Sequence, residues 1–332
     1  MRLPFLSRDN DCKEESLLPH YDMVSKSEAV IDKNSHQLLL EDVVKVYGGL
    51  HDRKTVLVNV DLRVSKGEFV ALVGPSGCGM STLLRLILGE EEPTSGSLYL
   101  DGEVLGYPDV SRGIVYQQYS LFPHLTALGN IMLGHRLSMG WSEWRRSKSE
   151  IRDKAEAYLK TAQLEEHMHK YPHELSGGQR QRCAVLQAMM LNPKVLLMDE
   201  PFGALDAGSR ERMQVFLLDQ WEKTGKTIFF VTHDLEEAVF IATRVVVLSQ
   251  YYTDDRKDIS SRGSRIVCDV AVGKKGEAAS TKSKLDQRFR EIIEHIRDRG
   301  FQPDHLYHVS QFDLSHNDSF HTVRAEEING TH

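Results

Sequence analysis

Gly74-Pro75-Ser76-Gly77-Cys78-Gly79-Met80-Ser81-Thr82 is the most informative segment of the chain. It follows an apolar run at residues 69–73 and precedes a run of helical character at residues 83–88. A strand that ends in a glycine-rich turn and continues as a helix directs several backbone N–H groups at one point, where the helix dipole adds positive potential. We therefore expect this segment to bind a phosphate group. Gly74, Gly79 and Ser81 fit the phosphate-loop pattern G-x-x-x-x-G-K-[S/T], but Met80 stands where the pattern has lysine.

Composition sets the broad class of the protein. With 332 residues, 27% of them charged and 40% hydrophobic, the chain has the size and composition of a globular protein with one large domain and appendages. Its net charge of −7 argues against a general polyanion-binding surface, so we expect no nucleic-acid partner. The four scattered cysteines indicate free thiols in a reducing compartment. No apolar run approaches the roughly 20 residues that span a bilayer, so we expect a cytoplasmic protein whose membrane role comes through a partner.

Alternating strand-like and helix-like runs over residues 37–250 predict an α/β fold with a parallel sheet flanked by helices. Short strand-like groups at residues 38–64 predict an antiparallel β subdomain, and residues 97–102 predict a hairpin. Apolar residues at helical spacing predict a helical subdomain inserted at about residues 118–177.

The two ends of the chain have weaker patterns. Residues 1–36 are polar without a sustained period and are expected to form a mobile extension. Residues 251–332 are expected to be a C-terminal extension with one amphipathic helix, at residues 285–296, which packs on the core or on a second copy. Beyond Gly300 we expect no clear element. The histidines there could hold a metal, but their loose spacing favours a solvated tail: His305, His308, His316 and His321.

Asp199 and Glu200 follow the apolar run at residues 195–198 and precede Pro201. A carboxylate at the end of a strand in a parallel sheet can face the phosphate loop across the crevice at the carboxyl ends of the strands. Magnesium prefers oxygen ligands, usually one or two carboxylates plus phosphates. We assign Asp199 to the metal shell, through water, and Glu200 to the base that polarises the attacking water. The alternative is two solvated acids at a strand end.

Ser176-Gly177-Gly178-Gln179 begins a helical run and makes a second anion-binding helix N-terminus, although alone it could be an ordinary N-cap. With the phosphate loop and the paired carboxylates, it makes the chain resemble the ATP-binding cassette (ABC) ATPases. The resemblance covers about residues 37–250 and implies a P-loop NTPase fold, ATP as the nucleotide and Mg²⁺ as the metal.

Four further positions match motifs of this family in their usual order. Gln117 matches the glutamine loop, which senses the metal and the γ-phosphate and contacts the membrane partner, while Gln118 is an adjacent decoy. Asp206 lies in the loop that contacts the opposite subunit's site, and His233 matches the switch histidine on the γ-phosphate. Tyr47 matches the aromatic residue that stacks on adenine, although a strand tyrosine is often part of the core.

The resemblance implies a head-to-tail dimer, in which ATP on the phosphate loop of one subunit is capped by residues 176–178 of the other. Because ATP binds the closed pair more tightly, hydrolysis is converted into motion. The implied partners are a second copy, transmembrane permease subunits and, for an importer, a soluble solute-binding protein, with this chain peripheral on the cytoplasmic face of the inner membrane. The implied site residues are, for catalysis, Glu200, His233 and Gln117; for nucleotide, Tyr47, Gly74, Pro75, Ser76, Gly77, Cys78, Gly79, Met80, Ser81, Thr82, Ser176, Gly177, Gly178, Gln179 and Asp206; and for metal, Ser81, Gln117 and Asp199.

Finer features point in two directions within the importers. Residues 74–79, 90–96 and 232–238 look like the bacterial importers of nitrate, taurine and sulfonates. Residues 88–90, residues 119–124 and the long insert near residues 141–144 look more like a branch of those importers associated with urea or guanidine breakdown. A soluble cassette protein that acts on nucleic acid or ribosomes is an alternative. Such proteins usually carry tandem cassettes or long coiled-coil arms, and this sequence has one cassette.

Met80 is the departure from the family pattern. Methionine keeps an unbranched stem but has neither the charge nor the N–H donors of lysine, so the loop should fold while ATP binding weakens and hydrolysis falls near background. A charged hydrogen bond contributes about 1.5–3 kcal/mol, and the loss of one transition-state donor costs roughly 10²–10³ in rate. Met80 is either an engineered inactivating substitution or a natural feature of a non-hydrolysing, nucleotide-gated regulator. We favour a native ATPase whose present copy is impaired.

Overall fold

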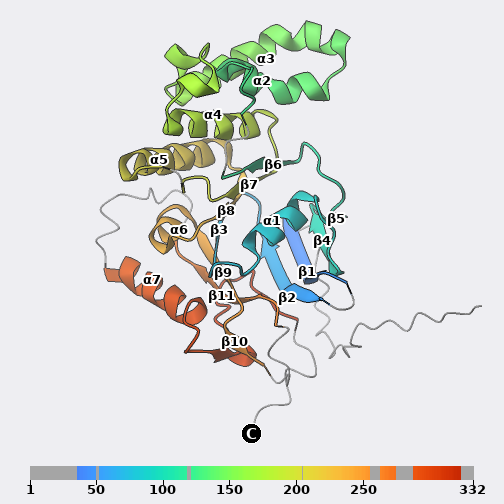
Figure 1. Cartoon of the computed structure of the whole chain (residues 1–332), viewed down its shortest axis with the longest axis vertical. Coiled ribbons are helices and arrows are strands. Elements are labelled where there is room, and N and C mark those ends of the chain that lie inside the picture. The colour runs from blue at the N-terminus through green and yellow to red at the C-terminus, as the bar shows by residue number, and fades with distance from the viewer. Residues whose placement is uncertain are drawn as a thin grey trace, which may run out of the picture.

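Two sheets form the frame of the molecule. The computed structural model describes residues 36–49, 52–117, 121–203, 205–254, 262–273 and 287–322. Figure 1 shows a larger sheet between helices and a smaller sheet beside it, with a helical layer beyond one end. The predicted α/β class is confirmed. The predicted N-terminal extension lies outside the described residues except for His36.

The larger sheet has six strands in the order β11-β9-β3-β8-β7-β6. All neighbours pair in parallel except β11, which is antiparallel to β9 at the edge. The strands are short and almost wholly buried, as expected for a parallel sheet covered on both faces. They are β3 (Phe69–Val73), β6 (Arg112–Val115), β7 (Val195–Asp199), β8 (Thr227–Val231), β9 (Arg244–Ser249) and β11 (Arg265–Ala271).

The side chains of β3 divide between two apolar clusters, one on each face of this sheet. Phe69, Ala71 and Val73 belong to the cluster that contains residues of helices α4, α5, α6 and α7. Val70 and Leu72 belong to the cluster that contains helix α1. Helices α1 and α4 therefore pack on opposite faces, since successive strand residues point to opposite sides. The helices are α1 (Met80–Leu88), α4 (Gly177–Met190), α5 (Ala207–Thr224), α6 (Leu235–Ile241) and α7 (Gln287–Gly300).

The smaller sheet is antiparallel, with strand order β2-β1-β4-β5. Its apolar side chains join those of α1 in one cluster, so α1 lies between the two sheets. Asp101 and Gly102 both have positive φ and make the turn of the predicted hairpin between β4 and β5. The strands are β1 (Leu38–Tyr47), β2 (Lys54–Val64), β4 (Ser95–Leu100) and β5 (Glu103–Val104).

A helical layer is inserted between β6 and β7, at the top of Figure 1. It contains α2 (Ala127–Ser138), α3 (Trp141–Thr161) and the short 3₁₀ helices η1 (Glu165–His167) and η2 (Pro172–Glu174), and it leads into α4. The charged helix α3 packs through the buried residues Ile151, Ala155 and Leu159, which repeat at the helical period.

The C-terminal part continues the core instead of leaving it. Strand β11 belongs to the larger sheet, so the boundary expected at residue 250 falls between two strands of one sheet. Short strands β10 (Tyr252–Thr253) and β12 (Tyr307–His308) pair in parallel, and the 3₁₀ helix η4 (Val309–Gln311) follows. Helix α7 packs on the core through Phe289, Ile293 and Ile296, as expected of the amphipathic helix, although residues 285 and 286 lie outside the described part.

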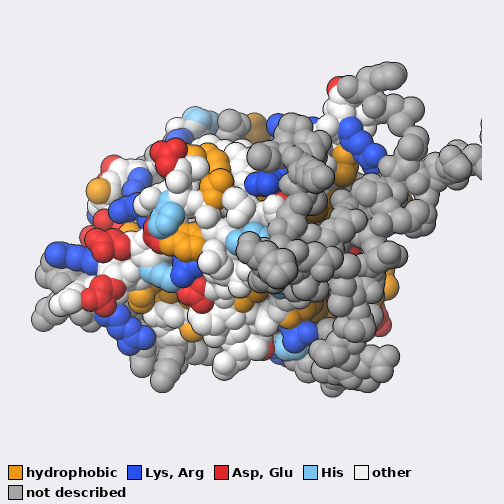
Figure 2. All heavy atoms as spheres, turned by 90° about the horizontal axis from the view of Figure 1, so that it is seen from below, with side chains coloured by type: hydrophobic (Ala, Val, Ile, Leu, Met, Phe, Trp, Pro, Cys, Tyr) orange, Lys and Arg blue, Asp and Glu red, His pale blue; other side chains and the backbone are white. Residues whose placement is uncertain are grey.

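The expectation of a solvated tail beyond Gly300 is wrong for its last described residues. His316 Nε2 lies 3.3 Å from Glu68 Oε1, and desolvation lowers the pKa of the half-buried His321 to about 4. The sequence pattern missed this packing because the partners of these polar residues are charged groups far away in the chain. His305, by contrast, is exposed and pairs with Asp298. Figure 2 shows the molecule from below, where histidine, acidic and basic side chains lie interspersed with apolar ones on the described part of the face.

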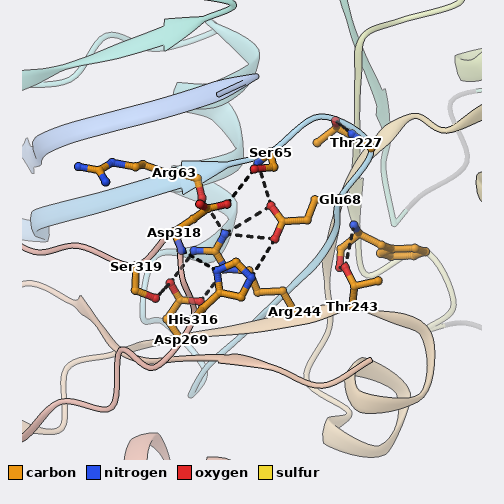
Figure 3. A network of polar contacts seen from close by, with 12 residues as sticks. Arg63, Ser65, Glu68, Thr227, Thr243, Arg244, Asp269, His316, Asp318 and Ser319 are labelled. Carbon is orange, nitrogen blue, oxygen red and sulfur yellow. Dashed lines mark hydrogen bonds and ion pairs between the residues drawn. The ribbon is translucent and has the colours of Figure 1, made fainter. Parts of the chain in front are cut away.

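Arg244 is the centre of the network that holds the tail (Figure 3). Its guanidinium is fully buried, and Nε and Nη2 donate to the two carboxylate oxygens of Asp269 at 2.6 Å each. Nη1 donates to Glu68 Oε1 at 3.3 Å. Ser319 Oγ donates to Asp269 at 2.6 Å, so a tail residue completes the shell of this ion pair.

Among the described helices, none has the length and apolar character that a membrane crossing requires.

Candidate nucleotide-binding site

The phosphate-loop segment has the backbone that its glycines permit. A Cβ atom on Gly74 would lie 2.1 Å from the Leu248 carbonyl oxygen, so only glycine fits between β3 and β9. Gly79 has φ +95° and caps α1, which begins at Met80. The side chain of Cys78, within this loop, is fully buried. Desolvation raises the pKa of its thiol to about 12, so the thiol stays neutral.

Met80 is packed as a core residue. Only 5% of it is exposed, and it belongs to the apolar cluster of α1 with Leu57 and Leu83. An apolar side chain thus fills the position at which the loop pattern has lysine. The groups this segment offers a phosphate are therefore its backbone N–H groups and the hydroxyls of Ser76, Ser81 and Thr82.

Ser81 and Asp199, both expected near a metal, come together from different elements. Ser81 Oγ at the start of α1 donates to Asp199 Oδ1 at the end of β7, at 3.5 Å. Desolvation raises the pKa of Asp199, while the Ser81 hydroxyl, Arg85 and His233 lower it. A hydroxyl and a carboxylate in contact are hard oxygen donors, which suits Mg²⁺.

Glu200 is the junction of the predicted catalytic residues. Gln117 Nε2 donates to Glu200 Oε2 at 3.2 Å, and His233 Nε2 lies 2.7 Å from Glu200 Oε1. His233 Nδ1 also lies 3.3 Å from the Gly74 carbonyl oxygen, so the ring links the carboxylate to the phosphate loop. Both ring nitrogens donate only in the imidazolium form. Glu200 adopts φ +44°, a conformation that non-glycine residues rarely take and that is common at functional sites.

Tyr47 lies at the end of β1 and is held by its hydroxyl. That hydroxyl donates to Glu91 Oε2 at 2.5 Å, and Lys45 Nζ lies 5.0 Å from the ring centroid and 2.9 Å from the same carboxylate. Desolvation by burial raises the pKa of Tyr47, as does Glu91, whereas the Thr82 hydroxyl lowers it. The ring is therefore fixed beside the last residue of the phosphate loop.

The residues expected to contact the opposite subunit form a second cluster. Ser176 and Gln179 cap α4 reciprocally, since Gln179 N donates to Ser176 Oγ at 3.3 Å and Ser176 N donates to Gln179 Oε1 at 2.9 Å. Asp206 caps α5, and the hydrogen bond from Ser209 lowers its pKa. A Cβ atom on Gly178 would lie 3.7 Å from Ser209 Cβ, so the two helix starts adjoin. The two helices that these residues cap pack, through their buried side chains, on the face of the sheet opposite α1.

Two hollows adjoin these residues. One, of about 840 Å³, is lined by Glu200, His233 and Arg210 and by Arg297 and Phe301 of the C-terminal part. No motif pointed to the last two, because Arg297 and Phe301 lie outside the region that resembles the family. Residue 204 and Gln118, the predicted decoy, lie outside the described residues.

The other hollow is a mainly apolar groove of about 480 Å³ where β6 meets the helical layer. Tyr116 and Phe122 line it, as does Leu137 of α2, which is 74% exposed. Gln117 directly follows Tyr116, so the groove begins beside the glutamine that contacts Glu200.

The six-stranded sheet, the phosphate loop and the carboxylates at the end of β7 define a P-loop ATPase of the ABC class. The family model described as "ABC transporter" matches residues 57–203. The nitrate import ATP-binding protein NrtD of Synechocystis sp. is 45% identical over 212 residues, which are 64% of this chain and 77% of NrtD. The chain therefore belongs to the ATP-binding proteins of ABC transporters.

Other relatives agree with this assignment. The taurine import ATP-binding protein TauB of Pseudomonas aeruginosa is 45% identical over 197 residues, 59% of this chain and 72% of TauB. A solved structure described as the dimeric post-hydrolysis state of the ATP-binding cassette MJ0796 bound to ADP and Pi is 31% identical, with a TM-score of 0.57 over 71% of this chain and 99% of that one. The predicted P-loop NTPase fold is confirmed, and the chain is an ABC-type ATPase by class.

Proposed function

We propose that this chain is the ATP-binding subunit of a bacterial ABC importer and that residues 74–82 bind the phosphates of ATP. The observation that carries the proposal is the contact of Glu200 with both Gln117 and His233, together with the contact of His233 with the Gly74 carbonyl. These contacts aim a carboxylate, an amide and an imidazole at the phosphate loop, which is the arrangement that positions water for attack on a phosphoryl group.

Each residue has a defined task in this proposal. Ser81 and Asp199, with Gln117, hold Mg²⁺, which would neutralise charge on the phosphates. Glu200 orients and polarises the attacking water, and His233 donates to the γ-phosphate. Tyr47 stacks on adenine, because its hydroxyl bond to Glu91 fixes the ring beside Thr82.

A head-to-tail dimer supplies the rest of the site. Ser176, Gly177, Gly178 and Gln179 lie on the face opposite α1, so they would cap a nucleotide on a second copy instead of their own. The N-cap of α4 presents backbone N–H groups to an anion, which suits a γ-phosphate. The dimeric state of the MJ0796 cassette supports the same assembly here.

The apolar groove beside Gln117 is the proposed binding site for a permease subunit. Its exposed Phe122 and Leu137 favour an apolar partner segment, and its position next to Gln117 couples that segment to the nucleotide. This places the subunit on the cytoplasmic face of the inner membrane through its transmembrane partners, with a solute-binding protein as an indirect partner.

The proposed solute is small and polar. Relatives named for nitrate, taurine and aliphatic sulfonates support a small polar solute of the nitrate or sulfonate type. The urea- or guanidine-associated branch is the second candidate, on the sequence of the helical insert. Uptake assays with nitrate, taurine and guanidine in cells that express the full transporter distinguish the two.

Met80 impairs this copy, because it buries an apolar side chain where a cation would meet the phosphates. Replacing Met80→Lys should raise Mg²⁺-dependent ATP turnover by about 10²–10³, while the matched Met80→Leu variant stays at background. A Met80→Lys protein that binds ATP without hydrolysing it would overturn the impaired-ATPase proposal and favour a nucleotide-gated regulator. Co-purification of nucleic acid would favour a soluble cassette protein.

A further inference from the structure

Three side chains of metal-ligand type meet beside α7, outside the nucleotide site. They are Cys268 of β11, His295 of α7 and Asp313, and one ligand atom of each lies within 4.8 Å of the other two. His295 Nε2 lies 2.6 Å from Asp313 Oδ2, and Cys268 is a fully buried free thiol. None of them takes part in the nucleotide chemistry proposed above. They come from three separate segments, so a shared ligand would join those segments.

The backbone fixes two of these residues side by side. Asp313 pairs with Cys268 in a parallel bridge, in which Asp313 N donates to Val267 O at 3.3 Å and Asp269 N donates to Asp313 O at 2.7 Å. Residues paired across neighbouring strands project to the same side. The thiol and the carboxylate are therefore held together by main-chain hydrogen bonds as well as by their side-chain packing.

Helix α7 is held close to the sheet and carries the third residue. A Cβ atom on Gly300 would lie 2.3 Å from Val247 Cγ1, and Ser249 Oγ donates to the Gly300 carbonyl at 2.7 Å. Ile293 and Ile296, on either side of His295 along the helix, are buried in the core. These contacts fix the helix, and a site carried on rigid elements is preorganised.

We propose that Cys268, His295 and Asp313 form a Zn²⁺ site that joins β11, α7 and the C-terminal segment. A thiolate sulfur, an imidazole nitrogen and a carboxylate oxygen are the three donors that Zn²⁺ takes in proteins, and water can fill a fourth position. The His295 and Asp313 side chains are 38% and 25% exposed, which leaves an entry path for the ion. Binding would release the proton of the Cys268 thiol.

The charges around the cluster suit a divalent cation. The bound thiolate and the Asp313 carboxylate contribute two negative charges, and Asp269 adds a third nearby that Arg244 already pairs. Arg299 is the cation that faces Cys268, but its guanidinium lies 4.1 Å from the Tyr307 ring centroid and donates to the Gln311 carbonyl at 2.9 Å. The local sum thus stays negative.

A second group of the same size shows the contrast (Figure 3). Glu68, His316 and Asp318 also place ligand atoms within 4.8 Å of one another. Arg244 Nη1 donates to Glu68 at 3.3 Å, and Ser65 Oγ donates to Asp318 at 2.8 Å. The guanidinium already serves as the cation of this group, so it carries no proposal.

Metal titration of the full chain tests the Zn²⁺ site. After dialysis against chelator, the protein should bind a single Zn²⁺, and Co²⁺ in its place should give the near-ultraviolet band of a thiolate–Co²⁺ bond. Cys268→Ser should abolish that band, and His295→Gln should weaken Zn²⁺ binding by about tenfold or more. The matched control is Cys183→Ser, since Cys183 is also fully buried but lies in α4.

Thermal unfolding separates loss of ligand from loss of fold. Zn²⁺ should raise the Tm of the unaltered chain, because an ion that binds only the folded state stabilises it. His295→Gln, at a partly exposed position, should keep the helical circular dichroism spectrum and lose the Zn²⁺-dependent rise. A folded chain that retains no Zn²⁺ and gives no thiolate band overturns the proposal, as does a Cys268→Ser protein that binds Zn²⁺ as tightly as the unaltered chain.

Discussion

The nucleotide site and the Arg244 network are both clusters of opposite charge, yet they differ in exposure. The side chains of Glu200 and His233 are 27% and 43% exposed, and both residues line the hollow of about 840 Å³. Arg244 and Asp269 are 0% and 3% exposed and satisfy each other at 2.6 Å. The nucleotide site is partly exposed and has a strained backbone at Glu200, so its side chains are available to a ligand. The buried Arg244–Asp269 pair is saturated by its own contacts, so it joins β9 to β11 instead of binding a ligand.

The largest effect is expected in the buried network. Arg244→Met would leave the carboxylates of Asp269 and Glu68 without their cation and should lower the free energy of unfolding by about 3–5 kcal/mol. Urea denaturation measures it. The control is Arg152→Ala, which breaks the exposed Arg152–Glu156 pair and should cost no more than about 1 kcal/mol. Equal losses of unfolding free energy in Arg244→Met and Arg152→Ala would contradict the conclusion that the buried ion pair stabilises the fold more than the exposed one.

At the nucleotide site the loss should appear in rate instead of stability. In a Met80→Lys background, Glu200→Gln keeps the size of the side chain but removes the charge that polarises water, so ATP turnover should fall by about 10²–10⁴. The unfolding midpoint should hardly move. Asp219→Asn, which alters an exposed carboxylate paired with Lys223, serves as the matched control. Unchanged turnover in Glu200→Gln would contradict the assignment of Glu200 as the base.

Acid should act on the C-terminal region through its histidines. Desolvation lowers the pKa of His321 to about 4 and also lowers that of His316. A histidine with a lowered folded-state pKa is held neutral, so the unfolded chain binds more protons between its ordinary pKa of about 6.5 and that lowered value. Stability should therefore be present above about pH 6.5 and fall as the pH drops toward 4, by about 2–3 kcal/mol for His321.

Denaturant midpoints across this range, compared with those of His321→Phe, check the pH effect. The variant cannot be protonated at this position, so its stability should depend less steeply on pH. Identical pH profiles for the two proteins would assign the acid sensitivity to other groups.

The smallest effect is expected at Ser176, the N-cap of α4. Ser176→Ala removes the acceptor of the Gln179 N–H and should destabilise the chain by about 1 kcal/mol. If the same residue caps ATP on a second copy, ATP-dependent pairing of a Met80→Lys protein should weaken as well, which analytical ultracentrifugation measures. Thr126→Ala removes the corresponding N-cap of α2 and is the control for helix capping alone. Equal pairing in Ser176→Ala and Thr126→Ala would count against the dimer proposal.

The phosphate loop, the order of the motifs and the α/β class could be predicted from the sequence alone, because each depends on residues that are close together in the chain. Gly74 and Gly79 are required by the local backbone, and the apolar runs at β7 and β8 are typical of buried parallel strands. The ABC class followed from these local signals, and the comparisons agree with it.

Only the tertiary structure decided which distant groups meet. The bond from Gln117 to Glu200, the burial of Met80, the Arg244 network and the meeting of Cys268, His295 and Asp313 depend on strand order and helix packing. Such contacts join residues that are remote in the chain. Their net free energy is set in the folded state, where pairing offsets the cost of desolvating the charged groups. No local pattern contains them, so the sequence predicts a solvated tail, although His316, Ser319 and His321 pack against the core.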